Sequence, residues 1–136
     1  MSVIADLRSG AKTVLDGTAL FAQTYSARPG SIGAIPCAFV DEVRCDLVHT
    51  AGVRQWAGEV DVVVVVGGFD NIEAQDDSDT IVSAVIDAFS DTPHMAGANT
   101  VSEPVRARTT TVDNGNGVGY PATVITIGRF VFAEGR

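Results

Sequence analysis

Acidic residues near the middle of the chain have the composition of a calcium site. Asp76, Asp77 and Asp79 supply three carboxylates within four positions. An EF-hand loop also needs glycine at its sixth position and glutamate at its twelfth. Counting from Asp77, these positions hold Val82 and Ala88. The carboxylates therefore favour another role, the start of a helix, where they cap free amides and meet the positive end of the helix dipole.

The stretch Gly115–Gly119 is rich enough in glycine to suggest a phosphate loop. Such a loop runs from a strand into the N-terminus of a helix, because the helix amides bind the phosphate. Here the glycines lie between two predicted strands. They therefore indicate a turn, and the segment Asp113–Gly117 carries the strongest hairpin signal in the sequence.

The remaining reactive side chains do not combine into a catalytic motif. His49 and His94 could each act as a general base, but neither has metal-ligand spacing to a cysteine or to the other histidine. No G-x-S-x-G motif is present. Cys37 and Cys45 would lie about 26 Å apart on an extended segment, too far for a disulfide, and are expected to be small buried hydrophobes. We expect a protein that is not an enzyme and that binds no metal or cofactor.

The apolar run Val62–Val66 organises the rest of the sequence. Consecutive valines favour a strand, and the lack of polar alternation predicts that both faces of the strand are covered. A chain of 136 residues can cover one face with its own helices. We expect a neighbouring copy to cover the other face, which makes the chain a building block of an assembly.

Several polar and aromatic residues are candidates for contacts in such an assembly. Arg106 and Arg108 share one face of a predicted strand, where they could bind phosphate or carboxylate, face solvent or form an intersubunit salt bridge. Trp56, which lies close to Arg54 in the sequence, could form a cation–π pair with it, anchor an interface or cap the local core. The expected interface residues are Arg54, Trp56, Val62, Val64, Arg106, Arg108, Asn114 and Asn116.

Composition narrows the classes of partner. The formal net charge is −8, with nine basic and seventeen acidic residues. Phosphate contacts need clustered Lys and Arg, so the sequence argues against specific nucleic-acid binding. The first residues lack the basic and apolar regions of a signal peptide, and no apolar stretch is long enough for a membrane span. We expect a soluble protein made in a cytoplasm.

Periodicity predicts an α+β fold with the element order α-β-β-α-β-β. Residues 3–16 form an amphipathic helix, and an ordered excursion over 18–35 could include one helical turn. Strands are predicted at 36–43 and about 58–66, followed by a helix that begins near Asp76 and ends by Asp91. Strands at about 101–112 and 120–133 complete a mostly antiparallel four-stranded sheet, with both helices packed on one face. In the last strand, Phe130 is expected on the same face as Thr126.

This pattern resembles the tail terminator proteins of long-tailed bacteriophages, the lambda-type terminators and their relatives in phages of actinobacteria. The matching features are the helix Ile4–Leu15, the strands Pro36–Val43 and Glu59–Gly67, the acidic-capped helix Asp76–Phe89 and the strand Gly119–Ile127. The resemblance covers residues 1–136 as a single domain. The segments 18–35 and 112–119 depart from the family pattern, and we expect partner contacts there.

The resemblance implies a structural virion protein. Its copies would form a homohexameric ring that caps the tail tube, stops tube polymerisation and meets the head-closure or connector protein in the neck. Genomic DNA would pass through the lumen without specific binding. The alternatives are another neck component, either a head-closure protein or a head–tail adaptor, and a small α+β hydrolase or ligand-binding domain that uses His49 or His94.

Overall fold

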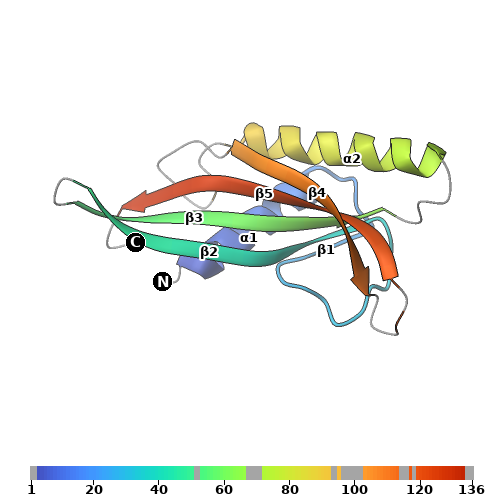
Figure 1. The fold of residues 1–136 in the computed structure, drawn as a ribbon, viewed down its shortest axis with the longest axis horizontal. Helices are drawn as coiled ribbons and strands as arrows, with labels where there is room; N and C mark the ends of the chain where they lie inside the picture. The colour runs from blue at the N-terminus through green and yellow to red at the C-terminus, as the bar shows by residue number, and fades with distance from the viewer. Residues whose placement is uncertain are drawn as a thin grey trace.

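The chain forms one mixed sheet flanked by two helices. The computed structural model describes residues 3–50, 53–66, 72–92, 95, 103–113, 117 and 119–133. Its elements are α1 (Val3–Gly17), β1 (Gln23–Tyr25), β2 (Cys37–Thr50), β3 (Val53–Val65), α2 (Ile72–Ser90), β4 (Glu103–Asp113) and β5 (Gly119–Ala133). The strand order is β1-β2-β3-β5-β4 (Figure 1). The predicted α+β class is confirmed.

The predicted four-stranded sheet is wrong because it omits β1. This three-residue strand pairs in parallel with Cys37–Phe39 at the start of β2, whereas all other pairings are antiparallel. It lies in the excursion over 18–35, for which the sequence predicts at most one helical turn. Three residues are too few to show the alternation by which a strand is recognised.

Two other element boundaries differ from the expectation. Strand β2 extends well past residue 43, and β3 begins before residue 58. Together they form one long hairpin, whose last pair is Thr50 with Val53. Helix α2 begins at Ile72, so the acidic residues from Asp76 onward lie inside the helix rather than at its cap. The predicted loop before Asp76 contains Glu, Ala and Gln, which are good helix formers.

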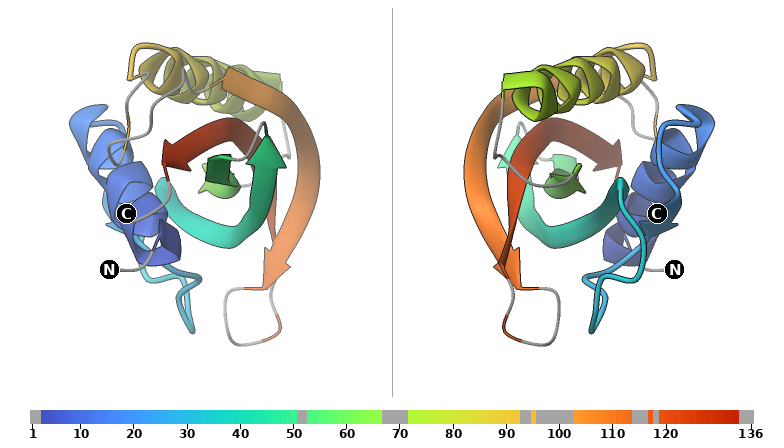
Figure 2. Two further views of the ribbon diagram at one scale, coloured as in Figure 1. Left: turned by 90° about the vertical axis from the view of Figure 1, so that its left-hand side faces the viewer. Right: turned by 90° about the vertical axis from the view of Figure 1, so that its right-hand side faces the viewer.

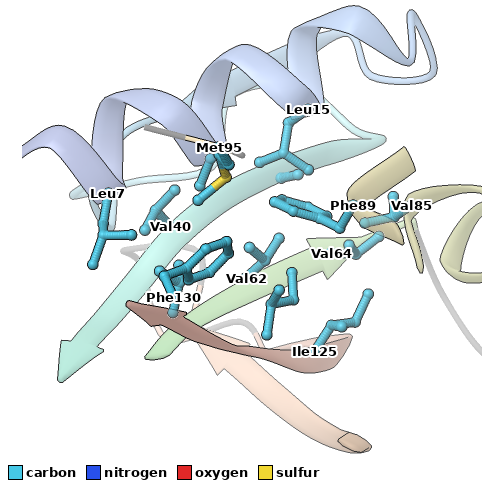
Figure 3. Packing of buried hydrophobic residues seen from close by; sticks show 14 of the residues in the cluster. Leu7, Leu15, Val40, Val62, Val64, Val85, Phe89, Met95, Ile125 and Phe130 are labelled. Atoms are coloured by element: carbon cyan, nitrogen blue, oxygen red, sulfur yellow. The ribbon is translucent and has the colours of Figure 1, made fainter. Parts of the chain in front are cut away.

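Both helices pack on the same face of the sheet, as predicted. From α1, Leu7, Ala11 and Leu15 are fully buried, and from α2, Val85 and Phe89 are fully buried. Figure 3 shows Leu7, Leu15, Val85 and Phe89 converging on side chains of the sheet, namely Val40, Val62, Val64, Ile125 and Phe130. We call these residues and their buried neighbours the helix-face core.

A second buried cluster lies on the opposite face, which we call the helix-free face. It consists of Cys37, Phe39, Val63, Val65, Val112, Ala122 and Val124. Val63 and Val65 are completely buried within the single chain. Tyr25 and Ile32, from the excursion, and Tyr120 pack against the cluster, and the strands curl strongly when viewed end-on (Figure 2). The expectation that a neighbouring copy must cover this face of the valine strand is therefore wrong.

A β-bulge between β3 and β5 changes the face on which the end of β5 presents its side chains. Val60 pairs with Ile127 and Gly58 with Phe130, so that Gly128 and Arg129 together oppose a single β3 residue. Phe130 consequently lies in the helix-face core with Ile127. The prediction that Phe130 shares the face of Thr126 is wrong, because strict alternation does not allow for the extra residue.

Gly58 allows close packing between β3 and α1. A Cβ atom at this position would lie 2.7 Å from Leu7 Cδ1 and 3.3 Å from Cys45 Sγ. Leu7 is fully buried and has little room to move. We expect Gly58→Ala to destabilise the fold by about 1–3 kcal/mol, the usual cost of overpacking a core. Thermal unfolding of this variant beside Gly33→Ala, where a Cβ would have nothing within 4 Å, would measure the effect. Equal melting temperatures would contradict it.

Candidate functional site

Ionisable side chains gather on the helix-free face, beyond the apolar cluster. Arg44 of β2, Glu59 and Asp61 of β3, and Thr126 of β5 form a group that we call the charged cluster. Glu42 lies at its rim, with its carboxylate 3.4 Å from Arg44 Nη1. The cluster combines one guanidinium with three carboxylates and is therefore net negative.

Asp61 is the centre of the charged cluster. Arg44 donates two hydrogen bonds to it, from Nη1 to Oδ2 and from Nη2 to Oδ1, each 3.0 Å long. Thr126 Oγ1 donates a third, 2.7 Å long, to Oδ1. The Asp61 side chain is 9% exposed and that of Arg44 is 34% exposed. A two-pronged contact of this kind fixes the orientation of both groups.

Strand alternation and a bulge place these residues together. Asp61 and Thr126 are paired across β3 and β5 and share a face with the paired residues Val63 and Val124. On β2, the register shifts between Val40 and Val43, so that two residues oppose one on β3. After this bulge Arg44 stands opposite Glu59 and reaches the carboxylate of Asp61.

The charged cluster forms a stable ion pair rather than a proton-transfer group. Burial alone would raise the pKa of Asp61, but hydrogen bonds from Arg44 and Thr126 and the positive charges of Arg44 and Arg108 outweigh it and lower the pKa. The hydrogen bond with Asp61 is the main cause that raises the pKa of Arg44 further above its ordinary value. Asp61 therefore stays ionised and Arg44 stays protonated at neutral pH, so neither group exchanges a proton readily there.

Acid should remove the stabilisation that the charged cluster provides. The folded-state pKa of Asp61 is lowered, so its contribution is present above the unfolded pKa of about 4 and is lost as pH falls through the lower folded value. We expect the free energy of unfolding to fall from pH 5 towards about pH 2, with a smaller fall in Asp61→Asn. Urea unfolding at several pH values would measure it. Identical pH profiles for the two proteins would contradict this role.

The expected interface residues fall into separate parts of the fold. Arg106 and Arg108 are exposed on β4, and their register with Thr126 and Val124 places both on the helix-free face. Trp56 is half-buried against the helix-face core, as in the local-cap interpretation. Val62 and Val64 are buried beneath the helices, at 0% and 1% exposure, so this chain presents neither of them to a partner.

Other candidates cannot be placed. Asn114, Asn116 and His94 lie outside the described residues, as do the side chains of His49 and Arg54. Cys37 is buried, as expected, whereas Cys45 is only half-buried; both are free. Within the described ranges, no group of three His, Cys, Asp or Glu side chains is arranged to hold a metal ion.

Sequence reasoning missed Arg44 and Asp61. The available signal was one carboxylate, Asp61, next to a run of five valines that was expected to be buried. A buried carboxylate needs a partner, and Arg44 and Arg54 are the basic residues nearest to it in the sequence. Arg54 precedes Asp61 by seven residues on the same strand, too far along it to reach the carboxylate. Alternation alone could not assign Arg44 to the face of Asp61, because the bulge at residues 41–42 changes the side on which the following β2 residues point.

Comparisons with protein-family models and with curated protein sequences find no match to this chain. Neither of the two described helices is long and apolar enough to cross a membrane.

Proposed function

We propose that the protein is a structural, non-enzymatic subunit of a bacteriophage virion, the tail terminator. Copies of the chain assemble into a ring at the head-side end of the tail tube. The family that the chain resembles implies six subunits in this ring. The ring stops polymerisation of the tube and joins it to the head-closure or connector protein. Genomic DNA passes through its lumen, and the net charge of −8 suits a channel that does not retain DNA.

The observation that carries the self-assembly part of this proposal is the pair of long open edges of the sheet. Over the described residues, β1 pairs only with Cys37–Phe39, which leaves the outer side of β2 without a strand from Val40 onward. At the opposite side, β4 ends the sheet along its whole length. An open edge presents unpaired amide and carbonyl groups, which are a template for pairing with another chain.

The phage part of the proposal rests on the resemblance of the sequence. Both matching helices and the long matching strands are present in the fold, and the additional β1 lies in the segment that departs from the family pattern. The charged cluster also fits a structural role, because its two central groups neutralise each other.

Locating the chain in phage particles tests this proposal. Particles of the phage that encodes the chain would be assembled with an affinity tag on the chain and labelled with a gold-conjugated antibody. We expect one cluster of label per particle, at the junction of tail tube and neck. Label at the portal side of the neck would favour a head-closure protein or adaptor instead. Label along the tube, or particles without the chain, would contradict a neck role.

A further inference from the structure

The two open edges differ in how much of each strand is accessible. Helix α1 and the excursion cover the first part of the β2 edge. Arg8 Nη1 of α1 donates to the carbonyl oxygen of Val40 at 3.3 Å, and Arg28 of the excursion makes a two-pronged salt bridge with Asp41. The open part of the β2 edge therefore begins at the end of the bulge, at about residue 42. β4 ends the sheet over Glu103–Asp113, and its residues 106–109 are exposed. Each stretch is long enough for several pairs of strand residues.

The exposed side chains on these two edges carry opposite charges on the same face of the sheet. On the helix-free face, β2 presents Glu42, whose side chain is 62% exposed, and Asp46. Arg44 between them contacts Asp61, Glu59 and Glu42, and its single positive charge is outnumbered by these three carboxylates, so this edge remains net negative. On the same face, β4 presents Arg106 and Arg108, which are both exposed. Opposite charges on neighbouring strands attract each other, and like charges repel.

The helix face of β2 also suits pairing with a further strand. Val43 and Cys45 pack on the helix-face core but remain half-exposed at the edge. The corresponding face of β4 carries Ala107 and Thr109, which are small and exposed. A strand placed beside β2 would cover the exposed parts of Val43 and Cys45 without requiring space for a large side chain.

Strand direction gives the geometry of such a junction. β2 runs antiparallel to β3, β3 to β5, and β5 to β4, so β4 runs antiparallel to β2 within one chain. In a ring, neighbouring copies are related by a rotation. If the rotation axis runs roughly along the strands, each strand keeps its direction from one copy to the next. β4 of one copy would then meet β2 of the next as an antiparallel pair.

We propose that the chain assembles head to tail, with the basic outer edge of β4 in one copy forming antiparallel strand pairs with the acidic outer edge of β2 in the next. This inference rests on the proposed function, because it describes how the ring is made. The occupant of each edge is a second copy of this chain. A symmetric dimer through β4 and β4 would oppose Arg106 and Arg108 to themselves, and one through β2 and β2 would oppose Glu42 and Asp46, so charge disfavours both.

Two charge-reversal variants and their mixture test the junction. Variant A carries Arg106→Glu and Arg108→Glu, which makes both of its edges acidic. Variant B carries Glu42→Arg and Asp46→Arg, which makes both edges basic. Asp87→Arg with Asp91→Arg is the matched control for B, because it changes the charge equally at exposed positions in and after α2. Circular dichroism of each variant would first check that it is folded.

Sedimentation velocity measures association up to about 1 mM, where a complex with a millimolar dissociation constant is substantially formed. We expect the wild type and the control to form oligomers larger than dimers, and variants A and B each to associate at least about tenfold more weakly. Mixing equal amounts of A and B should restore the large oligomers, because the edges of A complement those of B. A mixture that stops at a dimer would support a symmetric edge contact and overturn the head-to-tail junction.

Other outcomes separate this inference from the proposed function. Large oligomers that persist unchanged in A and in B would overturn the edge junction but leave a ring at the tube end possible. Wild-type protein that remains monomeric at about 1 mM would also overturn the junction. Label absent from the neck of particles would overturn the terminator function, even if A and B behaved as expected.

Discussion

Val63→Asp is expected to abolish the folded monomer. Val63 is completely buried in the cluster on the helix-free face, together with Phe39 and Val124. An ionised carboxylate there would have no partner, and its desolvation costs several kcal/mol. That loss is comparable with the whole stability of a domain, about 5–15 kcal/mol. Soluble yield and circular dichroism of the purified variant would measure the effect.

Ile4→Asp is the matched control for this substitution. Ile4 is 45% exposed on α1, so the carboxylate there remains hydrated and the protein should fold normally. The contradictory result would be a Val63→Asp variant that folds as a monomer and fails only to associate. That result would show that another copy, rather than this chain, covers the helix-free face.

Arg44→Met is expected to destabilise the fold by about 3 kcal/mol, towards the lower end of the range for breaking a buried ion pair. The substitution leaves Asp61, with its side chain 9% exposed, without its guanidinium partner. The value lies low in the range because the Arg44 side chain is 34% exposed and water partly screens the pair. Urea unfolding at pH 7 would measure the change in free energy.

Two further variants separate the loss of the ion pair from the loss of the Arg44 side chain. Arg106→Met makes the same change at an exposed position and should alter stability by less than about 0.5 kcal/mol. Adding Asp61→Val to Arg44→Met removes the unpaired carboxylate and should recover part of the loss, because apolar replacements of a buried pair are tolerated. A double variant less stable than Arg44→Met alone would contradict an unpaired charge as the cause.

The parts of the fold that the sequence predicted are those with repeated periodic patterns. Leu7, Ala11 and Leu15 recur at helical spacing over several turns, and these residues are buried as expected. The valine strand was recognised because β-branched residues in sequence strongly favour extended backbone. In both cases many residues contribute the same signal, so one exception does not change the prediction.

The errors occur where one or two residues decide the structure. The three residues of β1 carry no periodic signal, although they and the excursion cover the helix-free face. The extra residue in the bulge near Gly128 moves Phe130 to the opposite face. The premise that a second copy must bury Val63 therefore failed because the sequence did not show that this chain folds its own excursion over that face.

The candidate site was predictable only in part. Arg106 and Arg108 could be assigned to one strand face from alternation, and the structure places them there, both exposed. The charged cluster could not be predicted, because it depends on the bulge that brings Arg44 to Asp61. The two apolar clusters of the sheet are buried within the chain, and the proposed assembly therefore rests on the open edges of β2 and β4.

Native mass spectrometry of the untagged wild-type chain tests whether copies associate head to tail through two different edges. A head-to-tail contact continues until the ring closes, whereas a symmetric contact is satisfied by two copies. We expect a closed oligomer of more than two copies, with six the number that the family resemblance implies. A monomer or a dimer as the largest species at every concentration would contradict it.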